Sequence, residues 1–130
     1  MTKTLSVRTS AHSEFVDITS LVNEVVRESV AKNGICLVFS PHTTCGITIN
    51  ENADPDVRRD MIMGLDKTVP WKNGYHHLEG NSAAHIKSSM MGFSTVIPVS
   101  DNCLLLGTWQ GIYLCEFDGP RTRNVIVQVK

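Results

Sequence analysis

The sequence predicts an α+β fold, a small single domain of residues 1–130 in which largely antiparallel, sandwich-like sheets have about three helices outside. Three observations support this prediction. A chain of 130 residues suits one domain of ordinary size. The first half contains two segments with the apolar spacing of amphipathic helices. The last third consists of short β-type stretches joined mostly by short turns, which favours antiparallel pairing over a parallel sheet.

Three segments are predicted to be helical. Residues 17–32 carry apolar side chains at i, i+3, i+4 and i+7, and Gly34 is expected to stop this helix. A second helix is expected from Pro55, a residue that suits the first helical turn, to about Leu65. A third, short helix is expected to follow Asn81 and end at Gly92. The other expected N-caps are Asp17 or Thr19 for the first helix and Asp54 for the second.

About seven strands are predicted. Polar and apolar side chains alternate through residues 2–10, the period of a half-buried strand. Residues 68–80 are rich in Pro, Trp, Gly, Asn and His without a usable period, which predicts a long functional loop. The other predicted strands are residues 35–40, 46–50, 93–99, 103–108, 111–117 and 122–129.

Charge and hydropathy exclude several classes of protein. Twelve Lys and Arg against thirteen Asp and Glu leave a formal charge of −1, so no broad field favours nucleic acid or anionic lipid. The longest apolar run, residues 35–39, is far shorter than the roughly 20 residues that cross a bilayer. The first fifteen residues contain no apolar signal region, and we therefore expect a cytoplasmic protein.

The four cysteines are irregularly spaced and form no CxxC pair. In a cytoplasmic chain this pattern is typical of small buried hydrophobic residues. The alternative is that Cys45, beside residues 42–44, is a reactive thiol.

Three stretches, residues 42–51, 75–87 and 107–123, concentrate polar side chains beyond what a solvated surface needs. Four of the five histidines lie in or beside them, whereas His12 stands alone. Imidazole is the commonest neutral metal ligand and titrates near neutrality, so the cluster suggests a metal or acid–base site. Three histidines with one open position would suit a catalytic zinc or a similar ion. The spacing matches no local metal motif, and the alternative is two loop histidines and one that bonds to the core.

The same stretches offer an anion site. Thr43 and Thr44 carry hydroxyls and backbone amides in a tight loop, and cations follow at Lys87, Arg121 and Arg123. The simpler interpretation is that Arg121 is a solvated turn residue. Glycine-rich nucleotide signatures are absent from the sequence.

The segment around Trp109 lies between two predicted strands, and a tryptophan there is more often a packing residue than a ligand platform. Gln110 precedes the next predicted strand, Glu116 lies near the end of that strand, and Asn50 ends an earlier one. If these strands pair antiparallel, their polar side chains could project at one sheet end near the His42 loop.

Taken together, SPHTTCGITINENADPDVRRD (40–60), YHHLEGNSAAHIKSSMMG (75–92) and LLLGTWQGIYLCEFDGPRTR (104–123) resemble the YjbQ family in content, order and separation. The resemblance covers nearly the whole chain. It implies an α+β protein with sandwich-like sheets that forms a homotrimer, with a histidine cluster at a subunit boundary. The metal ligands that it implies are His42 of the H-T-[TS] motif, His77 of Y-x-H and His85 of AHxK. His76 occupies a variable position.

The family resemblance also implies a function, a weak thiamine-phosphate synthase activity. This transferase joins a pyrimidine methyl diphosphate to a thiazole phosphate and releases pyrophosphate, which a divalent ion, zinc or magnesium, would help to neutralise. The candidate catalytic residues are Glu79, Glu116 and Asp118, and the candidate substrate-binding residues are Thr43, Thr44, Asn50, Lys87, Gln110, Arg121 and Arg123.

Two alternatives remain open at this point. One is a different metal-assisted reaction on a small phosphorylated or carboxylated metabolite. The other is a non-enzymatic trimer that holds a metal ion or a small anion without turnover. A binder can close its metal shell with four or more protein ligands, whereas an enzyme keeps one position open.

Overall fold

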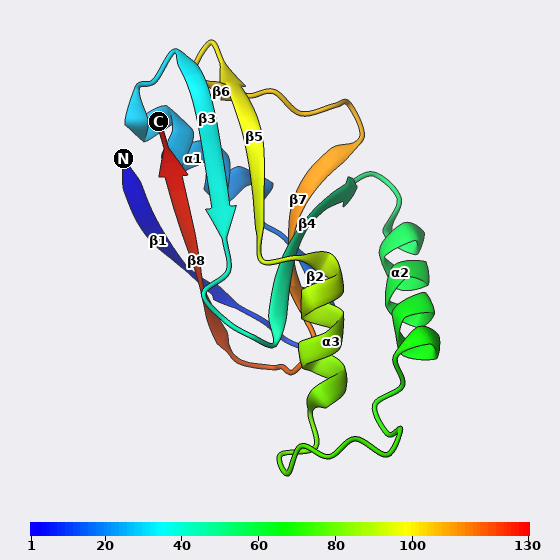
Figure 1. The fold of residues 1–130 in the computed structure, drawn as a ribbon. Coiled ribbons are helices and arrows are strands. Elements are labelled where there is room, and N and C mark those ends of the chain that lie inside the picture. Colours follow the sequence, from blue (N-terminus) through cyan, green and yellow to red (C-terminus); the bar gives the residue numbers. More distant parts are fainter.

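A computed structural model describes all of residues 1–130 as an α+β domain with three helices and two antiparallel sheets (Figure 1). The larger sheet has the strand order β1-β8-β3-β5-β6, and the smaller has the order β2-β7-β4. The strands are β1 (Thr2–Arg8), β2 (Glu14–Asp17), β3 (Asn33–Phe39), β4 (Cys45–Glu51), β5 (Ser94–Ser100), β6 (Cys103–Leu104), β7 (Gln110–Glu116) and β8 (Thr122–Val129). The helices are α1 (Thr19–Ser29), α2 (Pro55–Thr68) and α3 (Ser82–Met91).

The two sheets face each other across one apolar core. Alternate residues of β3, β5 and β8 in the larger sheet, and of β4 and β7 in the smaller, point into it. Helix α1 belongs to the same core, because Val22, Val25 and Val26 are buried there with side chains from both sheets. Its opposite side faces solvent. The predicted fold class is confirmed, with α1 set between the sheets rather than outside both.

Helices α2 and α3 cover the outer face of the smaller sheet (Figure 1). Tyr113, Cys115 and Phe117 point outward from the β7 segment and pack with Ala84 of α3 and with apolar side chains of α2. The end of α3 lies very close to β4, since a Cβ on Gly46 would stand 2.7 Å from the carbonyl oxygen of Gly92. This contact fixes the position of α3, and with it the side chains of its first turn. None of the three helices is both long and apolar enough to cross a membrane.

The chain changes sheets between β3 and β4. Phe39 ends β3 opposite Ile126 of the larger sheet, and Cys45 begins β4 opposite Glu116 of the smaller. The predicted strand, loop and strand are therefore correct, but the two strands do not form a hairpin. Residues 40–44 cross from one sheet to the other at the end of the sandwich.

Local details differ from the sequence predictions at several places. The N-cap of α1 is Ile18 rather than Asp17 or Thr19, and only Cys103–Leu104 of the strand expected over residues 103–108 forms, as β6. The first helix ends at Ser29, and its C-cap is Val30 in the left-handed conformation with φ of 50°, so Gly34 lies beyond the helix and inside β3. Strand β2 was not predicted, which raises the number of strands to eight. Asn81 occupies the N-cap position of α3, but its side chain makes no capping hydrogen bond.

Candidate functional site

A polar cavity of about 500 Å³ lies at the end of the sandwich where the chain changes sheets. Four segments form its walls: the crossing loop 41–44, the end of the long loop before α3, the first turn of α3, and residues 118–123, which connect β7 to β8 and include the start of β8. Its ionisable side chains are His42, His77, His85, Glu79, Asp118, Arg121 and Arg123. No apolar side chain lines it apart from the ring of Pro41. Three sequence stretches that were singled out for their polar content therefore meet in space.

A buried ion pair supports this cavity from below. Arg123 and Glu116 are both inaccessible to solvent, with side-chain exposures of 3% and 0%. Arg123 Nε donates to Glu116 Oε1 at 2.9 Å, and its Nη2 contacts Glu116 Oε2 and donates to Thr44 Oγ1 at 2.8 Å. Thr9 Oγ1 donates to Glu116 Oε1 at 2.8 Å. The pair thus connects β8 with β7 and holds the crossing loop against both.

Both members of the pair are charged at neutral pH. Burial alone would raise the pKa of Glu116, but the hydrogen bonds from Arg123, Thr9 and the Asp118 amide outweigh it and place this pKa below its ordinary value. Burial would likewise lower the pKa of Arg123, and the bond to Glu116 outweighs that effect and raises it. A permanent positive charge therefore lies in the floor of the cavity.

Glu116 was a candidate catalytic residue, and its position argues against direct chemistry. The side chain is wholly buried, does not line the cavity, and has hydrogen bonds on both carboxylate oxygens. Its structural role is to hold Arg123 and the backbone of Asp118. The sequence correctly placed Glu116 near the His42 loop, because Glu116 pairs with Cys45 across β4 and β7.

His42 is held by the backbone of β8. Its Nε2 accepts a hydrogen bond of 2.9 Å from the amide of Asn124, so the proton of the neutral ring is on Nδ1. Partial burial and the positive charge of Arg123 keep the pKa of His42 below its ordinary value. In this conformation His42 is a neutral hydrogen-bond donor, and it would bind a metal ion only after giving up the bond to Asn124.

His77 and His85 are neighbours across the cavity. Their ring centroids are 5.6 Å apart and the ring planes are nearly perpendicular, at 89°. A zinc ion bonded to two imidazoles at about 2.0–2.1 Å would place their rings at about this spacing. No group of three or more His, Cys, Asp or Glu side chains is close enough to hold a metal ion in this chain. His76 does not line the cavity, and the three-histidine metal site stays a prediction.

Asp118 connects the cavity to His12, a residue that the sequence did not suggest as part of a site. Its Oδ2 accepts a hydrogen bond from Asn81 Nδ2 at 2.9 Å and lies 3.3 Å from Arg121 Nη2. Arg121 Nε also donates to the Asp118 carbonyl at 2.9 Å. On the other side, His12 Nε2 lies 4.0 Å from Asp118 Oδ1. His12 comes here because β2, which follows it closely, pairs with β7, and only that pairing could have revealed its place.

Three predicted substrate-binding residues lie elsewhere. Asn50 and Gln110 are at the opposite end of the smaller sheet, where the antiparallel register of β4 and β7 places them about 20 Å from Glu116. Gln110 Oε1 accepts from the amide of Gly107 there. Lys87 lies on α3 away from His85 and pairs with Asp66 of α2.

The possibility of a reactive thiol at Cys45 is contradicted. Cys45 is fully buried, and burial raises the pKa of its thiol, which opposes thiolate formation. All four cysteines are free, and three of them are buried as predicted, whereas Cys103 is exposed.

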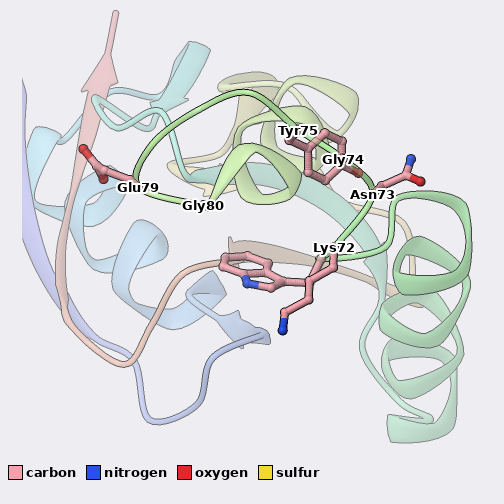
Figure 2. A pocket seen from close by; sticks show the side chains of 7 residues that line it. Lys72, Asn73, Gly74, Tyr75, Glu79 and Gly80 are labelled. Atoms are coloured by element: carbon pink, nitrogen blue, oxygen red, sulfur yellow. The ribbon is translucent and has the colours of Figure 1, made fainter.

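The loop between α2 and α3 forms an arch beside the cavity (Figure 2). It encloses a separate hollow of about 350 Å³ and is anchored by Tyr75, whose hydroxyl donates to the Pro70 carbonyl at 2.8 Å. In Figure 2 the side chain of Glu79 lies at the opposite end of the arch from Tyr75 and points away from it. Glu79 contributes to both hollows, so this arch forms one wall of the histidine cavity.

A family model described as "UPF0047 protein YjbQ-like" matches residues 3–130. The UPF0047 protein YugU of Bacillus subtilis is 50% identical over 130 residues, which is 99% of this chain and 98% of that protein. A UPF0047 protein of Methanocaldococcus jannaschii is 50% identical over 95% of this chain and 89% of its own. The crystal structure of an uncharacterised YjbQ/UPF0047 protein from Clostridium acetobutylicum has a TM-score of 0.97 at 55% identity, covering 98% of this chain and 99% of that one.

Replacing Glu116 tests the buried pair. We expect Glu116→Gln to lower the free energy of unfolding by about 3 kcal/mol or more, because Arg123 is left as an uncompensated buried charge. Since the folded pKa of Glu116 is depressed, its contribution is present above the ordinary value of 4.5 and is lost as pH falls through the folded pKa. The melting temperature of the wild-type protein should therefore fall as the pH is lowered below that value, and the melting temperature of the variant should fall less steeply.

The matched control is Glu28→Gln, which removes an exposed carboxylate paired with Lys3 and should cost less than about 1 kcal/mol. Equal losses for the two variants would mean that the buried pair contributes no more than a surface pair.

Proposed function

Because the chain belongs to the YjbQ-like UPF0047 family, we propose that it is a small metal-assisted enzyme with weak thiamine-phosphate synthase activity on phosphorylated small molecules. The observation that carries this proposal is the charged cavity, in which two arginines and three histidines from distant segments surround a space of about 500 Å³. A cavity with almost no apolar lining suits a small, highly charged ligand better than a hydrophobic one.

The proposed reaction makes one main demand on the protein. The ring nitrogen of the thiazole attacks the methylene carbon of the pyrimidine with its own lone pair, and the carbon–oxygen bond breaks so that pyrophosphate leaves with the electron pair. No proton has to be removed from the nucleophile. The demand is therefore for positive charge and hydrogen-bond donors around the leaving group.

The cavity side chains can be assigned to that demand. Arg121 and Arg123 supply guanidinium donors, His42 supplies Nδ1–H, and Thr43 and Thr44 bring the crossing loop to the cavity. His77 and His85 would hold a divalent ion, zinc or magnesium, which would contribute charge neutralisation at the leaving group. Glu79 and Asp118 are the acidic side chains within the same cavity that can complete such a site.

One observation favours the second candidate function, a non-enzymatic trimer that binds a metal ion or an anion. Asp118 is already engaged by Asn81 and Arg121, so it is not a free general base, and any reaction that needs proton transfer has less support here than binding alone. The four unpaired cysteines fit the reducing cytoplasm, where we place the protein under either function.

A turnover assay separates the two functions. Protein loaded with zinc or magnesium is given the pyrimidine methyl diphosphate and the thiazole phosphate, and pyrophosphate release is measured. We expect slow release that falls at least about tenfold in His85→Ala, because that variant removes one of the two facing imidazoles. Tight zinc binding without any release would support the binder, and neither binding nor release would contradict both functions.

Arg121 provides a test that needs no assumption about turnover. Its side chain is half exposed and reaches the cavity beside Asp118. We expect Arg121→Ala to weaken the binding of inorganic pyrophosphate at least about tenfold, because a charge-assisted hydrogen bond contributes roughly 1.5 to 3 kcal/mol. Calorimetric titration of the metal-loaded protein measures this change.

The control for Arg121 is Arg59→Ala, an exposed arginine of α2 that pairs only with Asp56. Unchanged pyrophosphate affinity in Arg121→Ala would reduce Arg121 to a structural partner of Asp118. Loss of the oligomer would instead make it an interface residue.

The outer face of the larger sheet supports the trimer proposal. Ile35 and Phe39 of β3 and Val96 of β5 remain 51%, 37% and 54% exposed on this face, which no helix covers. A contiguous apolar surface of this kind on a sheet is typical of a protein–protein interface. We propose that it packs against neighbouring subunits, with the cavity close to the boundary.

Light scattering is expected to give a homotrimer at micromolar concentration. Val96→Asp should shift it towards monomer, because a charge would be buried in an apolar interface. Met63→Asp adds the same charge at a similarly exposed apolar position of α2, which covers the smaller sheet, and should leave the oligomer intact. A monomeric wild-type protein would contradict the trimer.

A further inference from the structure

A second cavity, of about 460 Å³, lies next to the histidine cavity, because His12 lines it and also approaches Asp118 of the histidine cavity. It is lined by His12, Ser13, Asp66, Pro70, Trp71 and Lys87. The two cavities are separated by the contact between His12 and Asp118, whose nearest side-chain atoms are 4.0 Å apart. Neither the histidine site nor the proposed phosphate contacts use this second space.

Lys87 distinguishes this cavity from an ordinary surface depression, because it places a buried ammonium group in the wall. Its side chain is 3% exposed, and its ammonium lies 5.9 Å from the centre of the Phe117 ring. Within the protein the ammonium donates only to Oδ1 of Asp66, although an ammonium carries three donors. Burying a lysine that keeps two donors unused is costly, so the residue calls for a functional explanation.

Asp66 adds a hydrogen-bond acceptor to the cavity, beside the donors of Lys87. Its carboxylate is half exposed, and only Oδ1 is bonded, so Oδ2 remains a free acceptor next to the free donors of Lys87. The paired charges oppose any charged ligand: a carboxylate or phosphate would meet Asp66, and a cation would meet Lys87. An uncharged ligand with a donor beside an acceptor satisfies both side chains without removing the ion pair.

The remaining wall is aromatic. The rings of His12 and Trp71 pack edge to face, with centroids 4.5 Å apart and an interplanar angle of 83°. Trp71 is partly packed against the outer apolar cluster of the smaller sheet, which fixes its position. An indole face held in this way favours a flat ring over a flexible chain.

We propose that the second cavity binds a planar, uncharged nitrogen heterocycle that presents an exocyclic amino group beside a ring nitrogen, as an aminopyrimidine does. The amino group donates to Asp66, the ring nitrogen accepts from Lys87, and the ring lies against Trp71. This assignment deepens the proposed function and rests on it in one respect: it provides a place for the pyrimidine whose diphosphate occupies the adjacent histidine cavity.

The probe for this site is 4-aminopyrimidine at neutral pH, and the reporter is tryptophan fluorescence. The chain has two tryptophans, so Trp109→Phe, which alters an exposed residue outside both cavities, leaves Trp71 as the only reporter. We expect saturable quenching by 4-aminopyrimidine in this background. Adding Asp66→Asn should weaken binding at least about tenfold, because a charge-assisted acceptor is lost. Asp60→Asn, an exposed change on the same helix, should leave binding unchanged.

Two further measurements distinguish an aminopyrimidine site from an anion site and from a purely structural role of Lys87. Benzoate has a ring of the same size but carries a negative charge, and tighter binding of benzoate than of 4-aminopyrimidine would overturn the proposal in favour of an anion site at Lys87. Lys87→Met should abolish binding while the thermal melt shows a folded protein. If that variant unfolds, Asp66→Asn alone decides, and unchanged affinity there overturns the proposal.

The outcome also distinguishes this site from the proposed function. Aminopyrimidine binding without pyrophosphate binding would leave the second cavity standing and contradict the phosphate site. Pyrophosphate binding without saturable aminopyrimidine binding would overturn the second site and leave the histidine cavity as an anion site.

Discussion

The buried pair of Arg123 and Glu116 is the interaction on which the candidate site depends. Arg123 belongs to β8 of the larger sheet and Glu116 to β7 of the smaller, so the pair joins the two sheets at the end where the chain crosses between them. Thr44 and Thr9 complete its hydrogen bonds from two further segments. A buried pair is often no more stabilising than apolar residues of the same volume. Its effect here is geometric, because the crossing loop, β8 and Asp118 take their positions from it.

That constraint extends to the ionisation of the cavity. Partial burial, together with the charge of Arg123 beneath it, lowers the pKa of His42 and favours the neutral imidazole, and the Asn124 amide selects which nitrogen keeps the proton. The backbone amide of Asp118 donates a hydrogen bond to Glu116, which fixes its position, and the Asp118 carboxylate then contacts Asn81 and Arg121 and is approached by His12. The Arg123–Glu116 pair beneath the cavity therefore influences both which groups face the ligand and which of them carry charge.

The sequence predicted much of this, and the failures have specific physical causes. The helix start at Asp54 and Pro55 was correct because a cap and a proline act locally. Strand β2 was missed because four residues are too few to show a period, and without β2 His12 had no reason to approach Asp118. Gln110 was placed near the His42 loop because antiparallel pairing was foreseen without its register. Lys87 follows His85 by two residues, a spacing that turns the side chains to different sides of a helix.

The balance of charge in the cavity gives the metal ion a physical role in the proposed function. Two arginines, Arg121 and Arg123, stand among three carboxylates, those of Glu79, Asp118 and the buried Glu116, so these five side chains together carry one excess negative charge. Both guanidinium groups are already paired, and a pyrophosphate entering this site would meet no unmatched cation. Additional positive charge is needed before an anion is favoured, and His77 and His85 are the neutral ligands positioned to hold it. Anion binding and metal binding at this site should therefore be coupled, each increasing the affinity for the other.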